Sequence, residues 1–98
     1  LGLNETNNET DNQILIESSK LIIETSKDAK GQPATYRTNI IITITIKDKN
    51  KIVKTRSFNE SFSYNNIENK YDLSVYQKDV ENNLIKKIID DLIVFINL

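Results

Sequence analysis

The sequence predicts an α+β domain in which an antiparallel β-meander of about three strands is covered on one face by a long C-terminal α-helix, as a two-layer sandwich. Three observations predict it. Residues 34–47 alternate apolar and polar side chains with the period of two that is typical of a strand. The short polar segment DKNK separates them from a second alternating segment. From residue 74 onward, apolar residues recur every three to four positions, the period of an amphipathic helix.

The composition indicates one small domain without thiol or histidine chemistry. The chain has 98 residues, enough for a single domain. Residues 1–12 are polar and without an apolar period, so we expect a disordered or linker tail there and one domain over residues 13–98. The net charge of −1 argues against a nucleic-acid partner. There is no cysteine and no histidine, which removes thiolate ligands and the commonest general base.

The first expected strand, residues 13–27, contains a break. Its sequence QILIESSKLIIETSK alternates in each half, but the parity of the apolar positions changes at Ser18-Ser19. The apolar triplets also recur seven residues apart, which would suit a helix. Because β-branched residues dominate and no good helix cap precedes them, we expect a strand with a bulge at the two serines. The glycine and proline in KDAKGQP, residues 27–33, then predict a turn or loop.

The clearest expected strand covers residues 34–47. Its alternation gives it one apolar and one polar face. A short turn is expected at residues 48–51, because Asp initiates turns and Asn tolerates the left-handed conformation. The apolar face carries Tyr36, Thr38, Ile40, Ile42, Ile44 and Ile46, and the polar face carries Arg37, Asn39, Ile41, Thr43, Thr45 and Lys47.

Residues 52–64 are expected to return as the partner strand. Phe58 and Phe62 share one face of it. Val53 lies out of phase with these aromatic residues, which indicates a bulge at residues 54–56.

A helix is expected after a polar connector at residues 65–72. Ser74 and Gln77 have the spacing of a capping box at its start. A helix from there to the C-terminus would be about 37 Å long, close to the roughly 43 Å of a 13-residue strand. We therefore expect it to cover the sheet face that carries the even-numbered isoleucines, Phe58 and Phe62. Its apolar stripe comprises Tyr76, Val80, Leu84, Ile88, Leu92 and Phe95, widened by Ile85, Ile89 and Ile96.

The residues give little sign of catalysis or of cofactor and metal binding. Asp90 and Asp91 are expected on the solvent face of the helix, where neighbouring side chains point about 100° apart and do not converge. The serines of the return strand have no histidine to activate them. Two glycines are too few for a phosphate-binding loop. We therefore expect a protein that is not an enzyme and takes no cofactor.

Two groups of residues are candidates for binding. The lysines at the expected hairpin tip either keep the turn soluble and protect the strand ends, or form a cationic contact for anionic groups such as phosphates. The polar sheet face either faces solvent or docks against a partner. The tip comprises Lys47, Lys49, Lys51 and Lys54, and the candidate partner-binding residues of the face are Arg37, Asn39, Thr43 and Thr45.

Four consecutive segments within residues 26–98 carry a resemblance to a known family. SKDAKGQPATYRTNIIITI is similar to a glycine-containing turn that leads into a long strand with an arginine near its start. KDKNKIVKTRSF is similar to a hairpin tip and return strand, and SFSYNNIENKYDLSVYQKD to the strand end, connector and helix start that follow. NNLIKKIIDDLIVFINL is similar to a closing helix. In this order and spacing they resemble the C-terminal part of the LPS-assembly lipoproteins, the LptE family.

The resemblance implies a protein on the periplasmic side of a Gram-negative outer membrane, associated with it through a lipid anchor not present in this chain. Such proteins plug and help assemble a β-barrel lipopolysaccharide (LPS) translocon of the LptD type. The tip lysines would then face lipid A phosphates, and the polar sheet face would meet the polar wall of the barrel. The alternative is a generic periplasmic or surface α+β binding module that recognises a protein partner through its sheet face or edge.

Overall fold

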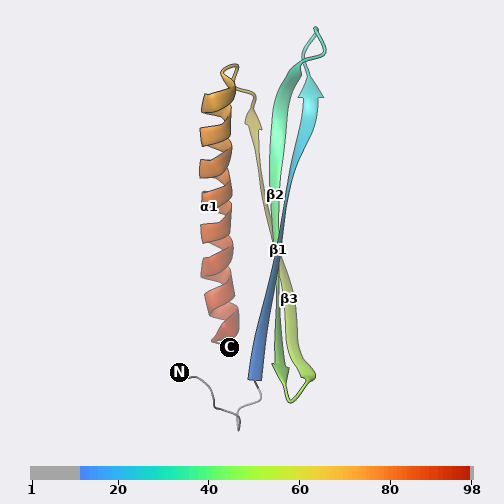
Figure 1. The fold of residues 1–98 in the computed structure, drawn as a ribbon, viewed down its shortest axis with the longest axis vertical. Coiled ribbons are helices and arrows are strands. Elements are labelled where there is room, and N and C mark those ends of the chain that lie inside the picture. Colours follow the sequence, from blue (N-terminus) through green and yellow to red (C-terminus); the bar gives the residue numbers. More distant parts are fainter. Residues whose placement is uncertain (1–11, 98) are drawn as a thin grey trace.

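A computed structural model describes residues 12–97 and shows a three-stranded antiparallel sheet followed by one long helix (Figure 1). The strands are in sequence order, β1-β2-β3, so the sheet is a meander with β2 at its centre. The helix lies along one face, and the described part is a rod of 62 × 25 × 20 Å. The predicted two-layer α+β architecture is therefore confirmed. The elements are β1 (Asn12–Lys27), β2 (Pro33–Asp48), β3 (Lys51–Asn65) and α1 (Lys70–Ile96).

Both strand connections are built by residues suited to turns. In the β1–β2 connection, the Asp28 carboxylate accepts hydrogen bonds from the backbone N–H groups of Lys30 and Gln32, at 2.8 and 2.9 Å. Gly31 has a φ of 80°, a value that glycine adopts without steric cost. In the β2–β3 connection, Lys49 and Asn50 have φ values of 51° and 67°, as a tight two-residue hairpin requires. The two predicted turns are confirmed.

The core lies between α1 and the central part of the sheet. Ile44 of β2 and Ile88 of α1 are completely buried, with 0% of each exposed. Burying a side chain of this size contributes about 1.5–3 kcal/mol, so a few such residues hold the two layers together. Phe62 is 49% exposed, although it lies on the same sheet face. The buried apolar residues are Ile40, Ile42, Ile44, Phe58, Tyr64, Val80, Leu84 and Ile88.

Aromatic rings close the core near the start of α1. Tyr64 stacks on Tyr36 at a centroid distance of 6.0 Å and meets Tyr76 of α1 edge-on at 5.5 Å. Its hydroxyl lies 2.7 Å from the hydroxyl of Thr38, which is completely buried. The pair satisfies two polar groups that burial would otherwise leave without a partner.

The start of α1 differs from the prediction. The helix begins at Lys70, and its N-cap is Asn69, whose side-chain oxygen accepts a hydrogen bond from the Asp72 N–H at 3.0 Å. The predicted capping box at Ser74 and Gln77 is wrong, because these residues lie inside the helix. Asn69 already satisfies an N–H group of the first turn, and Asp72 is favourable near the positive end of the helix dipole.

The bulges also differ from the prediction. β1 continues through Ser18 and Ser19 without a change of register, and its irregularity lies between Glu24 and Lys27. The predicted break is wrong because α1 packs over β2 and β3 and reaches β1 through the Lys20–Glu81 ion pair, which leaves both faces of β1 largely exposed, so its apolar residues are not confined to one face. In β3 the extra residue is Val53, just before the predicted positions, which explains why it is out of phase.

We expect Ile88→Ala to lower the free energy of unfolding by about 2–5 kcal/mol, because it opens a cavity in the fully buried core. Val94→Ala is the matched control, because Val94 lies on the same helix and is 62% exposed. The control should change stability by less than about 0.5 kcal/mol. Urea unfolding followed by circular dichroism measures both. Equal losses in the two variants would contradict the assigned helix face.

The Thr38–Tyr64 pair is tested by a double-mutant cycle. Tyr64→Phe leaves the buried Thr38 hydroxyl without this partner and should cost about 1–3 kcal/mol. Adding Thr38→Val removes the unsatisfied group, so the double variant should be more stable than the sum of the two single losses predicts. Strict additivity in urea unfolding would show that the two hydroxyls do not interact.

Candidate binding surfaces

The sheet face opposite α1, hereafter the outer face, is exposed along the whole rod. It carries the odd-numbered residues of β1 up to Ile23, of β2, and of β3 from Thr55 onward, because directly paired residues share a face; before the β3 bulge it carries the exposed Ile52, which pairs with Lys47. The residues predicted to bind a partner, Arg37, Asn39, Thr43 and Thr45, all lie on it and are half-buried by their neighbours on the adjacent strands. The Thr43 hydroxyl lies 2.8 Å from that of Ser57. The other polar members on β3 are Thr55, Asn59, Ser61 and Ser63.

The outer face has a polar part and an apolar part. Over β2 and β3 its side chains are mainly hydroxyls and amides, but on β1 it carries Leu15 and Leu21, and Leu21 is 58% exposed. The apolar part is signalled in the sequence at Ser18-Ser19, where the alternating apolar residues change from even-numbered to odd-numbered positions. This change places Leu21 on the outer face and Ile16 on the face toward α1. β1 therefore exposes apolar side chains on both of its faces.

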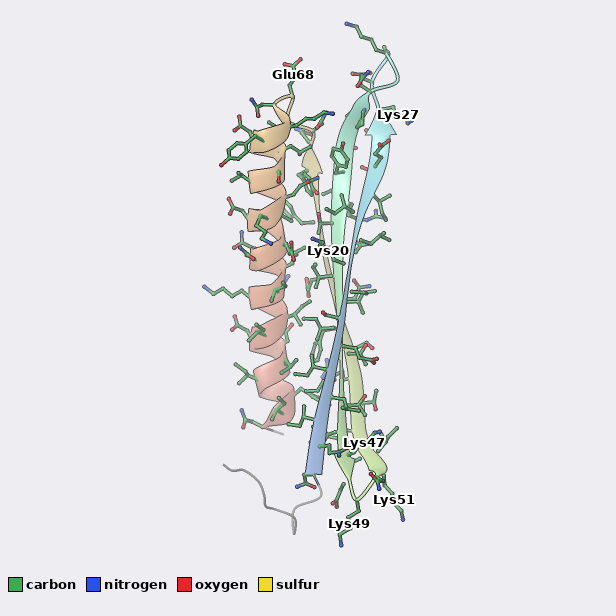
Figure 2. The ribbon with its side chains drawn as sticks, viewed as in Figure 1. Lys20, Lys27, Lys47, Lys49, Lys51 and Glu68 are labelled. Carbon is green, nitrogen blue, oxygen red and sulfur yellow. The ribbon has the colours of Figure 1, made fainter. Side chains whose placement is uncertain are left out.

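The predicted cationic tip is present in part. Lys47, Lys49 and Lys51 lie around the β2–β3 turn at one end of the rod (Figure 2). Lys49 and Lys51 are exposed and Lys47 is half-buried. Lys54 lies on the face toward α1, with its ammonium 5.6 Å from the ring centroid of Phe95. The tip available to an anionic ligand is therefore formed by the other three lysines, and Lys54 is already held in a cation–π contact.

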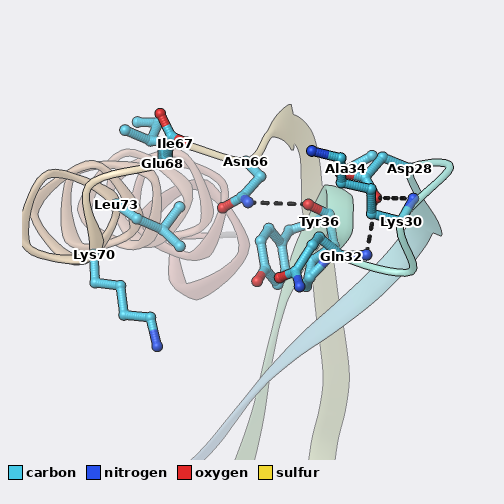
Figure 3. Close-up of a pocket in the computed structure, with 11 residues that line it drawn as sticks. Asp28, Lys30, Gln32, Ala34, Tyr36, Asn66, Ile67, Glu68, Lys70 and Leu73 are labelled. Atoms are coloured by element: carbon cyan, nitrogen blue, oxygen red, sulfur yellow. Dashed lines mark hydrogen bonds between the residues drawn. The ribbon is translucent and has the colours of Figure 1, made fainter.

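An open cavity of about 830 Å³ lies at the other end of the rod, between the β1–β2 turn and the start of α1 (Figure 3). Its polar groups serve the local structure. Asp28 accepts from the backbone of its own turn, and the Asn66 amide donates to the Pro33 carbonyl at 2.9 Å. Its charges are mixed, with Lys30 and Lys70 near Asp28 and Glu68, so the cavity does not favour a ligand of one sign.

A second cavity, of about 390 Å³, is the groove between β1 and α1. It exists because α1 packs over β2 and β3 and leaves β1 uncovered. At one point Lys20 of β1 reaches Glu81 of α1, with Nζ and Oε1 3.2 Å apart. The groove is mainly apolar, and its apolar lining comprises Ile16, Ile40, Ile42, Ile85, Ile89 and Leu92.

The carboxylates and serines considered as catalytic candidates are dispersed over the described residues. No group of three or more Asp or Glu side chains within residues 12–97 could hold a metal ion. Asp90 and Asp91 are exposed on α1, as predicted, and Ser57, Ser61 and Ser63 are spread along the exposed side of β3.

Among residues 12–97, no helix combines the length and the apolar character that a membrane span requires. Comparison with protein-family models and with curated proteins gives no match for the chain.

Proposed function

We propose that this protein is a non-enzymatic LPS-assembly protein that plugs a β-barrel LPS translocon of the outer membrane and helps it assemble. The observation that carries the proposal is the polar part of the outer face, a long surface of hydroxyls and amides that α1 leaves free. The resemblance of residues 26–98 to the LptE family supports it. The protein would act on the periplasmic side of the membrane, held there by a lipid anchor.

The shape and polarity of the rod suit a barrel lumen. The interior of a large outer-membrane barrel is polar, and large barrels are often filled by a plug. A rod of 25 × 20 Å in cross-section can enter such a lumen lengthwise, and its outer face offers hydrogen-bonding groups along most of its length. Each hydrogen bond to the wall contributes about 0.5–1.5 kcal/mol net, so a row of them gives a specific contact without an apolar interface.

The cationic tip supports a role with lipopolysaccharide. Lipid A carries phosphate groups, and lysine ammonium groups bind phosphate as compact point charges. Lys47, Lys49 and Lys51 extend from the hairpin end of the rod, where only Asp48 among their immediate neighbours is acidic. A plug with this end directed toward the passing lipid would present the ammonium groups to its phosphates.

A second candidate function is favoured by β1. The edge of β1 that faces away from β2 pairs with no other strand in the described chain, so it could accept an extended segment of a protein partner by strand addition. In that case the protein is a generic periplasmic or surface binding module.

The tip is tested by the double variant Lys49→Glu and Lys51→Glu. Because both residues are exposed, folding should be unchanged, and LPS binding should weaken by at least about tenfold, or about 1.4 kcal/mol. The control is Lys27→Glu with Lys30→Glu, which changes the charge equally at the β1–β2 connection, at the opposite end of the rod, where Figure 2 labels Lys27. Isothermal titration calorimetry with purified LPS measures both. A loss of equal size in both double variants would show that net charge, and not the tip, decides binding.

The outer face is tested by placing a photo-cross-linking amino acid at Asn59 or at Asn82. Both asparagines are exposed, but Asn59 lies on the outer face and Asn82 on α1. In outer membranes of a native-type host, the Asn59 variant should cross-link to the barrel severalfold more efficiently than the Asn82 variant. The reverse order would place the helix, and not the outer face, against the wall.

A further inference from the structure

The groove between β1 and α1 continues past the ion pair that crosses it. It has two parts, each a cavity of about 390 Å³. Lys20 of β1 and Glu81 of α1 line both parts, so the parts meet where these two side chains approach each other (Figure 2). One part extends from this ion pair toward the start of α1, and the other toward the end of α1.

The two parts differ in polarity. Toward the end of α1, the lining residues other than the ion pair are uncharged and mainly apolar. Ile16 of β1 and Ile89 of α1 form opposite walls there, and they are 59% and 44% exposed. Toward the start of α1, the helix instead lines the groove with Ser74, Gln77 and Lys78. The groove is therefore amphiphilic along its length, with the change of character at the ion pair.

The size of the apolar part suits a single acyl chain. From Glu81 to Leu92 the groove follows α1 for about 16 Å, at 1.5 Å per residue. A lipid chain spans one leaflet, about half of the roughly 30 Å hydrocarbon core of a bilayer. The volume of about 390 Å³ lies near the lower end of the range of about 300–1,000 Å³ for small-molecule sites. This volume favours one chain over a lipid with several.

The charges at the polar end are complementary to an anionic head group. Two lysines, Lys20 and Lys78, line this part with a single carboxylate, that of Glu81, which pairs with Lys20 at 3.2 Å. Lys78 lies about two turns before Ile85 on the same side of α1, and it makes no ion pair with any residue among 12–97. A second carboxylate bound here would balance the charge and accept charge-assisted hydrogen bonds from the ammonium groups.

We propose that the groove between β1 and α1 binds one long-chain fatty acid. Its carboxylate lies at Lys20 and Lys78, and its chain lies between Ile16 and Ile89. The occupant is a fatty acid because the groove combines a narrow apolar part with an excess of one positive charge at one end. The site includes neither the outer face nor the lysine tip, so the inference goes beyond the proposed function.

The apolar part is tested by isothermal titration calorimetry of the purified protein with myristate. We expect a dissociation constant of about 100 μM or tighter, because a myristoyl chain alone binds a bilayer with an association constant of about 10⁴ M⁻¹. Ile89→Asp should weaken binding at least about tenfold, because it places a carboxylate in the path of the chain. Val94→Asp is the matched control, since Val94 is exposed on the same helix and lines neither part of the groove. Ile16→Asp on the opposite wall is an independent second variant with the same expected loss.

The polar end is tested with a ligand of opposite charge and with a second pair of variants. Myristoylcholine has the same chain and a cationic head, so it should bind at least about tenfold more weakly than myristate. Lys78→Glu should weaken myristate binding severalfold, whereas Lys86→Glu, also exposed on α1 but outside the groove, should not.

Three results would overturn the proposal. They are an absence of myristate binding, an equal loss in Ile89→Asp and Val94→Asp, and equal binding of myristate and myristoylcholine. The first would leave the groove to an apolar segment of a protein. Neither a barrel nor LPS is present in these experiments, so their failure is distinct from a failure of the proposed function.

Discussion

The packing of the α1 apolar stripe against the isoleucines of β2 is the contact on which the rest of the structure depends. Ile44 and Ile88 are fully buried where the two layers meet. A three-stranded sheet needs an apolar face covered by a second layer to be stable by itself. β2 also pairs with both other strands, so the helix that covers it holds the whole meander indirectly. The ion pairs from α1 to Lys20 and Glu60 are partly exposed and contribute at most about 1 kcal/mol each.

The position of this contact determines which surfaces are free to bind. A single helix is about 10 Å wide and covers two neighbouring strands of a sheet. Because α1 lies over β2 and β3, β1 keeps one edge that pairs with no strand among residues 12–97 and two largely exposed faces. The outer face receives no second layer at all from the described residues, so its polar side chains remain available. The described part of the fold thus leaves two separate surfaces uncovered, a polar face with a cationic tip and an apolar edge.

Much of the fold could be predicted because two segments have strict periods. The alternation in residues 34–47 assigns every side chain of β2 to a face, and the predicted faces of Arg37 and Thr43 followed from it. The apolar stripe of α1 was equally clear, and its members Val80, Leu84 and Ile88 are buried. These predictions needed only the local spacing of apolar and polar residues, which can be read from the sequence alone.

The remainder depends on contacts between residues far apart in the sequence. The break expected in β1 followed from its change of apolar positions at Ser18-Ser19, and only the position of α1, over β2 and β3, shows that both faces of β1 stay largely exposed. The start of α1 at Asn69 depends on the path of the connector, since both Asn69 and Ser74 are suitable caps by residue type. The sequence places Lys54 with the tip lysines, but in the structure its ammonium lies over the ring of Phe95, away from the tip. Sequence proximity alone could not distinguish Lys54 from the other three lysines.

The central claim is that the protein works inside an outer-membrane β-barrel. Its most direct test is a pull-down of the full-length protein, tagged at its C-terminus, from outer membranes of a native-type host dissolved in mild detergent. The account predicts recovery of a large β-barrel in a ratio near one to one. Recovery of the protein alone, or with a soluble periplasmic partner, would contradict it and would favour the binding module.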